Sequence, residues 1–323
     1  MAHFTSSIRQ YFKKLWQKTS FAEKIGIFFI LQFAIFAPFI ASSGYDFYST
    51  FRVATLTGNY GQNTWNPYPA YWLLTPFSML PPQIGFLLWN VLAAVGFITA
   101  IRHLGGRFLP FALSLPCFWL LYVGQFEGVV ALGLALGMVA PPLWAGLGLV
   151  LLALKPQIGL FAIVFILLRR RDAKLLAVPA MIALLSLLYW GWWLPEWLDS
   201  IIGNRATGYA ANISLWPYSL VLLPLLLFKR SSLRLWLIVQ SLVVPYFAVY
   251  SLAILYTMWL PLWANLLTWG LYILGIFLPV KMPGFIIPLG LLAHLAYMNR
   301  AELQAYWSAG LGLGELEVKS VKY

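Results

Sequence analysis

Residues Gly44–Pro69 read GYDFYSTFRVATLTGNYGQNTWNPYP and form a polar interval in a chain that is otherwise strongly apolar. They follow the first long apolar run, Ile25–Ile40, almost at once. A carboxylate at the centre of a membrane helix costs about 2.5–3.5 kcal/mol, so we expect Asp46 to lie at the membrane interface. The interval therefore predicts a first membrane helix that delivers Asp46 to a surface where it is available for chemistry.

The composition excludes a soluble domain. Hydrophobic residues make up 62% of the chain and charged residues 9%, whereas a soluble domain typically holds about 25% charged residues. Apolar runs recur from Ile25 to Met298 and leave no room for a separate soluble domain. We therefore expect an all-α polytopic membrane protein.

The positive charge of the chain points to membrane orientation rather than to nucleic acid. The net charge is +12, but the basic residues fall in short clusters between apolar runs, such as Arg102 with Arg107 and Arg169–Arg171. Clusters of this kind mark cytoplasmic loops by the positive-inside rule. We expect a multi-pass protein of the cell membrane, with both termini in the cytoplasm and no nucleic-acid partner.

The same pattern divides the chain into one membrane domain and two terminal segments. Residues 1–24 are expected to form a cytoplasmic basic amphipathic segment, residues 25–299 the transmembrane domain and residues 300–323 a cytoplasmic tail. The domain should contain about 12 membrane helices with short re-entrant elements, and outer loops at 42–66 and 194–215. Toward the C-terminus, breaks are expected near Pro245-Tyr246, Trp263–Asn265 and Pro279–Pro283.

Two breaks in the middle of the chain carry polar residues. A turn at Gly124–Glu127 separates two apolar runs, and Lys155-Pro156 interrupts the run Leu143–Leu168. Proline removes a helix hydrogen bond, so two half-spanning helices should meet at Lys155. Irregular backbone at membrane depth is tolerated where it lines protein or a wet cavity, so we interpret Lys155 as a cavity residue.

The topology sorts the few acidic residues of the chain. Of nine acids, those on the outer side are Asp46, Glu127, Glu196 and Asp199, and the outer or embedded cations are Arg52, Lys155, Arg205 and Lys281. A carboxylate can deprotonate a hydroxyl that attacks an activated sugar, and nearby cations can stabilise the departing phosphate. Asp46 with Lys155 and Arg205 meets this requirement. Neither outer loop holds an acidic pair at DxD spacing, so no metal is predicted.

Each of these residues has a purely structural alternative. Asp46 could cap a helix that starts at Phe47, and Lys155 could extend its ammonium to the interface. Arg52 could form an interfacial salt bridge or a headgroup contact. Glu127 could orient Gln125 or solvate a turn.

The order of several short motifs resembles glycosyltransferase family eighty-seven. The motifs are Tyr45-Asp46, the Asn-Pro-Tyr-Pro at residues 66–69, the run from Leu73 to Asn90, Gly124-Gln125, and Leu154-Lys155-Pro156-Gln157 after Ala145-Gly146. The resemblance covers Tyr45–Arg171 and reaches Pro245-Tyr246 weakly. It implies a GT-C fold, a mannosyltransferase-like activity and polyprenyl-phosphate sugars as donors. It also implies that Asp46 is the catalytic aspartate and that Lys155 lies on the phosphate side.

These observations together predict a membrane glycosyltransferase. It would move a mannose-like sugar from a polyprenyl-phosphate donor to a hydroxyl of a lipid or glycan on the non-cytoplasmic face, with inversion, because one base is present without a partner nucleophile. Asp46 is the expected catalytic residue, no cofactor is expected, and the expected substrate-binding residues are Tyr45, Arg52, Asn66, Gln125, Glu127, Lys155 and Arg205. The alternative is a catalytically silent scaffold subunit that binds lipid or a partner protein. A transporter is disfavoured because the sequence shows no internal repeat.

Overall fold

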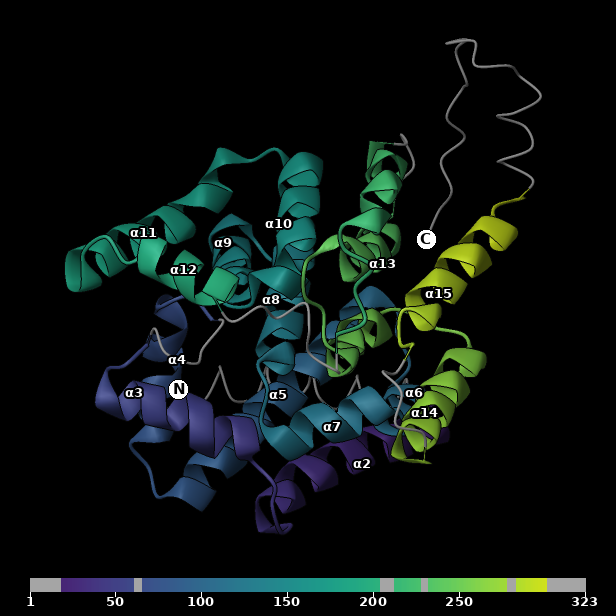
Figure 1. Ribbon diagram of the computed structural model, residues 1–323, viewed down its shortest axis with the longest axis horizontal. Coiled ribbons are helices and arrows are strands. Elements are labelled where there is room, and N and C mark those ends of the chain that lie inside the picture. The colour runs from purple at the N-terminus through teal and green to yellow at the C-terminus, as the bar shows by residue number, and fades with distance from the viewer. Residues whose placement is uncertain (1–18, 61–65, 204–211, 228–231, 278–282, 301–323) are drawn as a thin grey trace, which may run out of the picture.

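The structure, a computed structural model, describes residues 19–60, 66–203, 212–227, 232–277 and 283–300. Within these ranges the chain is built of helices and their connections, with no strand (Figure 1). The all-α prediction is confirmed for this part of the chain. The predicted terminal segments fall mostly on residues 1–18 and 301–323, which lie outside the described residues.

The helices follow one another in a simple order. They are α2 (Phe21–Phe36), η1 (Ala37–Phe39), the π-helix η2 (Asp46–Arg52), α3 (Val53–Thr57), α4 (Pro69–Ser78), α5 (Pro82–Leu104), α6 (Phe108–Ala112), α7 (Leu115–Val123), α8 (Glu127–Val139), α9 (Pro142–Ala153), α10 (Pro156–Arg170), η3 (Ala173–Leu176), α11 (Ala177–Trp190), α12 (Leu194–Gly203), η5 (Tyr218–Leu227), α13 (Leu233–Val243), η6 (Val249–Thr257), α14 (Leu262–Phe277) and α15 (Ile286–Met298).

Three helical segments in the described ranges are long and apolar enough to cross a membrane: Phe21–Phe39, Pro82–Leu104 and Ala173–Trp190. The pair α7 and α8 would add a fourth if it counts as one broken span, although the two helices meet at 114°. A span needs about 20 apolar residues, and most of the remaining helices are shorter. The structure therefore supports a membrane protein, and the count of about 12 crossings stays a prediction.

Helix α8 lies at the centre of the molecule, between α5 and α9 (Figure 1). Small residues let these helices approach closely. A Cβ atom on Gly128 would lie 2.3 Å from the Cα atom of Ala93, and one on Gly133 would lie 2.8 Å from the carbonyl oxygen of Gly148. Small residues serve this purpose in membrane helix packing. The start of α8, which carries Glu127, is thereby fixed against α5.

Most of the helix breaks predicted from the sequence are present in the structure. Helices α7 and α8 are separated at Gly124–Phe126, and α9 and α10 are separated at Lys155. The break predicted near Trp263–Asn265 lies slightly earlier, at Met258–Pro261, and α14 begins at Leu262. The break predicted around Pro279–Pro283 lies mostly outside the described residues. Proline is tolerated near a helix start rather than in its interior, and Pro261 immediately precedes α14.

The two intervals predicted as outer loops contain helices. Residues 42–66 hold η2 and α3, and residues 194–215 hold α12. Polarity suggested loops, but Phe47 and Phe51 are buried, with exposed fractions of 0% and 4%. One buried face is enough to hold a short helix on the domain.

A separate aromatic cluster lies beneath η2, and we define it as Phe47, Phe51, Tyr71, Phe86, Trp89 and Phe126. The rings of Phe47 and Phe86 stack at 5.4 Å between centroids, and Phe51 and Trp89 meet the Phe126 ring edge-on at 4.8 and 4.9 Å. Such pairs contribute about 0.5–1.5 kcal/mol each beyond burial. The cluster joins η2 to α4, α5 and the turn before α8.

Candidate active site

The turn between α7 and α8 presents two of the predicted site residues. Gly124 ends α7 in the left-handed conformation, with φ of 83°. A Cβ atom there would lie 2.7 Å from the Phe86 ring. Glycine therefore suits this position both for its backbone conformation and for the lack of space for a side chain. The indole of Trp89 donates to the Gly124 carbonyl oxygen at 3.0 Å. With Phe126 fully buried in the aromatic cluster, the flanking residues Gln125 and Glu127 are held in fixed positions.

The π-helix η2 brings Asp46 to this turn. The backbone N–H of Gly44 donates to the carbonyl oxygen of Tyr122 at 2.6 Å, which ties the start of η2 to α7. Tyr45, not Asp46, occupies the N-cap position of η2, and the Asp46 carboxylate accepts a hydrogen bond from the amide of Gln125 instead. The capping alternative for Asp46 is therefore wrong. π-Helical turns are rare and occur frequently at functional sites.

The break between α9 and α10 places Lys155 near the same turn. Pro156 begins α10 and cannot donate a backbone hydrogen bond. Side chains from other segments satisfy the interrupted backbone: Asn66 donates to the Leu154 carbonyl oxygen at 2.8 Å, and Gln240 donates to that of Gln157 at 3.0 Å. Backbone at membrane depth must be satisfied within the protein. Both amides therefore help to stabilise the irregular segment that carries Lys155.

The ammonium of Lys155 is buried and paired. Its Nζ atom donates to Glu127 Oε1 at 2.6 Å and to Gln125 Oε1 at 2.8 Å. The exposed fractions of the Lys155 and Glu127 side chains are 4% and 0%. Two alternatives are therefore wrong: the Lys155 ammonium does not extend to the interface, and Glu127 does not solvate a turn. Burial of a charge is expensive unless the charge is paired, and each residue offsets that cost for the other.

Helix η6 contributes two residues that the sequence analysis did not single out. Ser251 donates to Glu127 Oε1 at 2.6 Å, and Gln125 Nε2 donates to the Tyr250 hydroxyl at 3.3 Å. The Tyr250 ring lies beneath the Lys155 ammonium at 5.1 Å. A polar pair just after the predicted break at Pro245-Tyr246 was the available signal. The site therefore draws on η2, the α7–α8 turn, the α9–α10 break and η6.

Burial is the main influence on the acidity of Asp46. Loss of water raises the pKa of the Asp46 carboxyl above its usual range, and the Gln125 hydrogen bond and the positive charge of Lys155 offset part of that rise. A carboxyl with a raised pKa binds a proton more strongly, which suits a general base. The geometry and the pKa of Asp46 are both compatible with proton transfer.

The remaining predicted site residues are less closely associated with this group. Tyr45 is 66% exposed. Arg52 ends η2, and its Nε atom is buried without a hydrogen-bond partner in the described part of the chain. Asn66 contacts the backbone of the Lys155 break, as described above. Arg205 lies outside the described residues.

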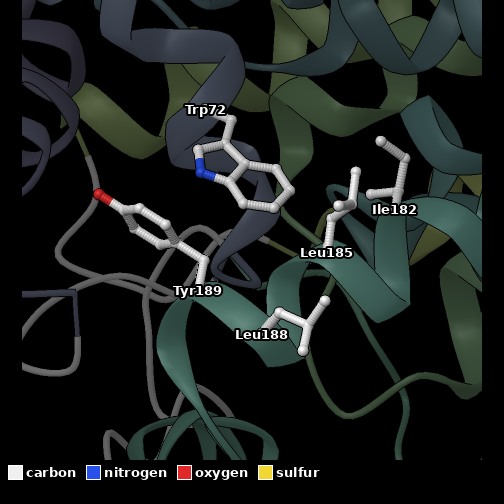
Figure 2. A pocket seen from close by; sticks show the side chains of 5 residues that line it. All are labelled: Trp72, Ile182, Leu185, Leu188 and Tyr189. Atoms are coloured by element: carbon white, nitrogen blue, oxygen red, sulfur yellow. The ribbon is translucent and has the colours of Figure 1, made fainter.

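An apolar cavity of about 460 Å³ lies elsewhere, between α4 and α11 (Figure 2). Trp72, Ile182, Leu185, Leu188 and Tyr189 line it. Figure 2 shows the five side chains that line the cavity, with no charged group among them. Sugar phosphates are bound most strongly by charged donors such as arginine or lysine, and the lining of this cavity has none, so it suits hydrocarbon rather than a sugar phosphate. A lipid-facing cavity at Asp46 stays a prediction.

Comparison with known proteins identifies the family. The model of glycosyltransferase family 87 matches residues 64–282, more than half of the chain. The match includes Asn66, Gln125, Glu127 and Lys155, and it begins after Asp46. No curated protein and no solved structure matches the chain. The apolar helices and the extent of the family match together show that the chain belongs to glycosyltransferase family 87 and is a membrane glycosyltransferase.

Proposed function

We propose that this protein transfers a mannose-like hexose from a polyprenyl-phosphate donor to a hydroxyl group of a lipid or glycan. The observation that carries the proposal is the contact chain from Asp46 through Gln125 to Lys155. It brings a carboxylate and a cation, which lie more than a hundred residues apart in the sequence, to the two sides of one amide group. Transfer from a sugar phosphate needs such a base and such a cation.

In the proposed reaction Asp46 acts on the acceptor. Its carboxylate takes the proton of the acceptor hydroxyl while the oxygen attacks C1 of the sugar. The new glycosidic C–O bond forms as the bond from C1 to the phosphate oxygen breaks, and the polyprenyl phosphate leaves with the electron pair. Direct displacement by the acceptor inverts the configuration at C1.

Lys155 is the proposed contact for the departing phosphate. An ammonium has three N–H donors, and two of those of Lys155 are used by Gln125 and Glu127 among the described residues. The third is available for an anionic oxygen. Arg52 and Arg205 are proposed as further contacts for the donor, and the exposed ring of Tyr45 as a contact for the sugar.

The proposed reaction takes place on the non-cytoplasmic side of the cell membrane, in a multi-pass protein with both termini in the cytoplasm. The basic clusters support this orientation, because Arg102, Arg107 and Arg169–Arg171 follow segments that lead away from the Asp46 side.

The test is transfer by the purified protein in detergent or in vesicles. It should be supplied with polyprenyl-phosphate mannose and, in parallel, with polyprenyl-phosphate glucose, together with a lipid extract as acceptor. Formation of a glycosylated product and release of polyprenyl phosphate are expected with at least one donor. No product from either donor, with intact protein, would contradict the proposal.

One observation favours a second candidate, a silent scaffold subunit. The Lys155–Glu127 pair satisfies the lysine within the protein, so a bound phosphate is not needed to explain its burial. Thermal unfolding separates the two functions. The enzyme should show a higher melting temperature with polyprenyl phosphate, whereas a scaffold without a donor site should show the same melting temperature with and without that lipid.

A further inference from the structure

The Gln125 amide has a chemically determined orientation. Its single acceptor, Oε1, receives the Lys155 ammonium at 2.8 Å, and its Nε2 group donates to the Asp46 carboxylate. The reversed amide would place an NH₂ group against an ammonium and a carbonyl oxygen against a carboxylate. The charges on either side therefore select one of the two orientations.

The Lys155 ammonium is itself held in a fixed position. Lys155 is held by Glu127, and Ser251 donates to the same oxygen, Oε1, that Lys155 contacts. The other oxygen, Oε2, is buried and has no hydrogen-bond partner within the described ranges. Glu127 and Ser251 together keep the ammonium at the position from which it orients the amide.

The Asp46 carboxylate keeps one oxygen available to accept a proton. Of the two carboxylate oxygens of Asp46, Oδ2 accepts the Gln125 hydrogen bond, and Oδ1 accepts none from the residues that the structure describes. A carboxylate that serves as a base needs one oxygen directed at the substrate proton and its orientation held by the other.

We infer that Gln125 is a positioning residue: it transmits the charge of Lys155 to the orientation of the Asp46 carboxylate and leaves Oδ1 as the atom that accepts the proton. The inference rests on the proposed function, in which Asp46 is the base. It also reassigns Gln125, which the sequence analysis interpreted as a substrate contact.

The titratable and charged groups that face Asp46 and Gln125 come from three segments. They are Lys155 from the α9–α10 break, Glu127 from α8 and Tyr250 from η6. Lys155 and Tyr250 both form hydrogen bonds with the amide, but only Lys155 carries a charge there, so Lys155 determines which end of the amide faces Asp46.

The pH dependence of transfer tests the inference. Gln125→Glu places a second carboxylate against Asp46, and two carboxylates that share a site hold a proton at higher pH than either alone. The acidic limb of kcat/KM should therefore move to higher pH by about one unit or more. The control is Gln83→Glu, which adds the same charge at an exposed position in the first turn of α5 and should leave the profile unchanged.

A paired exchange separates orientation from general disturbance. In Asp46→Asn/Gln125→Glu the amide and the carboxylate trade places, so a hydrogen bond between residues 46 and 125 can form again. The melting temperature of the double variant should be closer to that of wild type than the melting temperature of Gln125→Glu is. Transfer by the double variant should stay at least about a hundredfold reduced, because the base has moved. Recovery of both stability and transfer, or of neither, would overturn the inference.

The failure of each proposal gives a distinct result. Wild-type transfer in Asp46→Asn alone would reject the proposed base. An inactive Asp46→Asn combined with an unmoved acidic limb in an active Gln125→Glu would reject only the positioning role. The decisive experiment is therefore the set of pH profiles of wild type, Gln125→Glu and Gln83→Glu, with a shift in Gln125→Glu alone as the expected result and three coincident acidic limbs as the result that overturns the role.

Discussion

The Nζ atom of Lys155 lies 2.6 Å from Oε1 of Glu127, and both side chains are buried. Removal of one partner would leave the other charge buried and unpaired, which typically destabilises a protein by about 3–5 kcal/mol. Lys155→Met should therefore lower the free energy of unfolding by about that amount, measured by unfolding in detergent. Lys155→Met/Glu127→Leu should recover most of the loss, and Lys174→Met, at an exposed position, should have little effect. An equally stable Lys155→Met would contradict the pair.

The Lys155–Glu127 pair determines whether the stability of a Lys155 variant can distinguish the enzyme from the scaffold. If a donor phosphate were the only partner of the Lys155 ammonium, an enzyme would tolerate loss of the lysine, and only a scaffold with an internal partner would be destabilised. Because Glu127 is the internal partner, destabilisation is now expected in both cases. The response to polyprenyl phosphate, rather than the stability of the empty protein, separates the two functions.

The acidity of Asp46 predicts a pH limit for transfer. Burial raises the pKa of its carboxyl above the value of about 3.9 that a free aspartate shows. The base works only when it is deprotonated, so activity should be lost as the pH falls through this raised pKa. A pH profile of kcat/KM should show an acidic limb above that of a solvent-exposed aspartate. A profile that stays flat down to pH values near 4 would contradict this prediction.

Close packing at the start of α8 predicts a second stability effect. A methyl group on Gly128 would meet the backbone of Ala93, whereas Gly270 in α14 has no atom within 4 Å of the added Cβ. Gly128→Ala should destabilise the protein by about 1–3 kcal/mol and displace Glu127. Gly270→Ala should be neutral or stabilising by up to about 1 kcal/mol. Unfolding in detergent measures the change in stability of both variants. Equal changes in the two variants would contradict the close approach of α5 and α8 at Gly128.

The orientation of the site is open to chemical labelling. In a Cys117→Ser background, Asn59→Cys just after α3 and Asp172→Cys just after α10 provide two single cysteines. An impermeant thiol reagent applied from outside intact cells should label position 59 and not position 172. The reverse pattern would place Asp46 on the cytoplasmic side and would reject the proposed location of transfer.

The local features of the site were predictable because single residues determine them. Gly124 and Pro156 interrupt apolar runs, and both breaks lie where the sequence placed them. Asp46, Gln125 and Lys155 were predicted to belong to one site, but the contacts between them were not predicted. Contacts between residues far apart in the sequence leave no periodic pattern. Ser251 and Tyr250 were missed for the same reason. The interval that holds η2 was predicted as a loop because the polar residues around Phe47 and Phe51 concealed the buried face that these two side chains form.

The number of membrane crossings shows where sequence reasoning is weakest in this chain. Apolar runs of 10–17 residues, such as α9 and α13, satisfy a hydropathy pattern without the length of a full span. Their ends depend on side chains from distant segments, as at the α9–α10 break, where Asn66 and Gln240 satisfy the backbone. Local composition cannot specify such partners.

The most direct test of the account is the turnover of a polyprenyl-phosphate sugar by Asp46→Asn. Asparagine can still accept the Gln125 hydrogen bond but cannot serve as the base, and loss of a general base typically costs about a hundredfold or more in rate. The control is Asp199→Asn, which removes an exposed carboxylate of α12. We predict at least a hundredfold slower transfer in Asp46→Asn, about wild-type transfer in Asp199→Asn, and similar melting temperatures for both. Wild-type turnover by Asp46→Asn would contradict the assignment of Asp46 as the catalytic base.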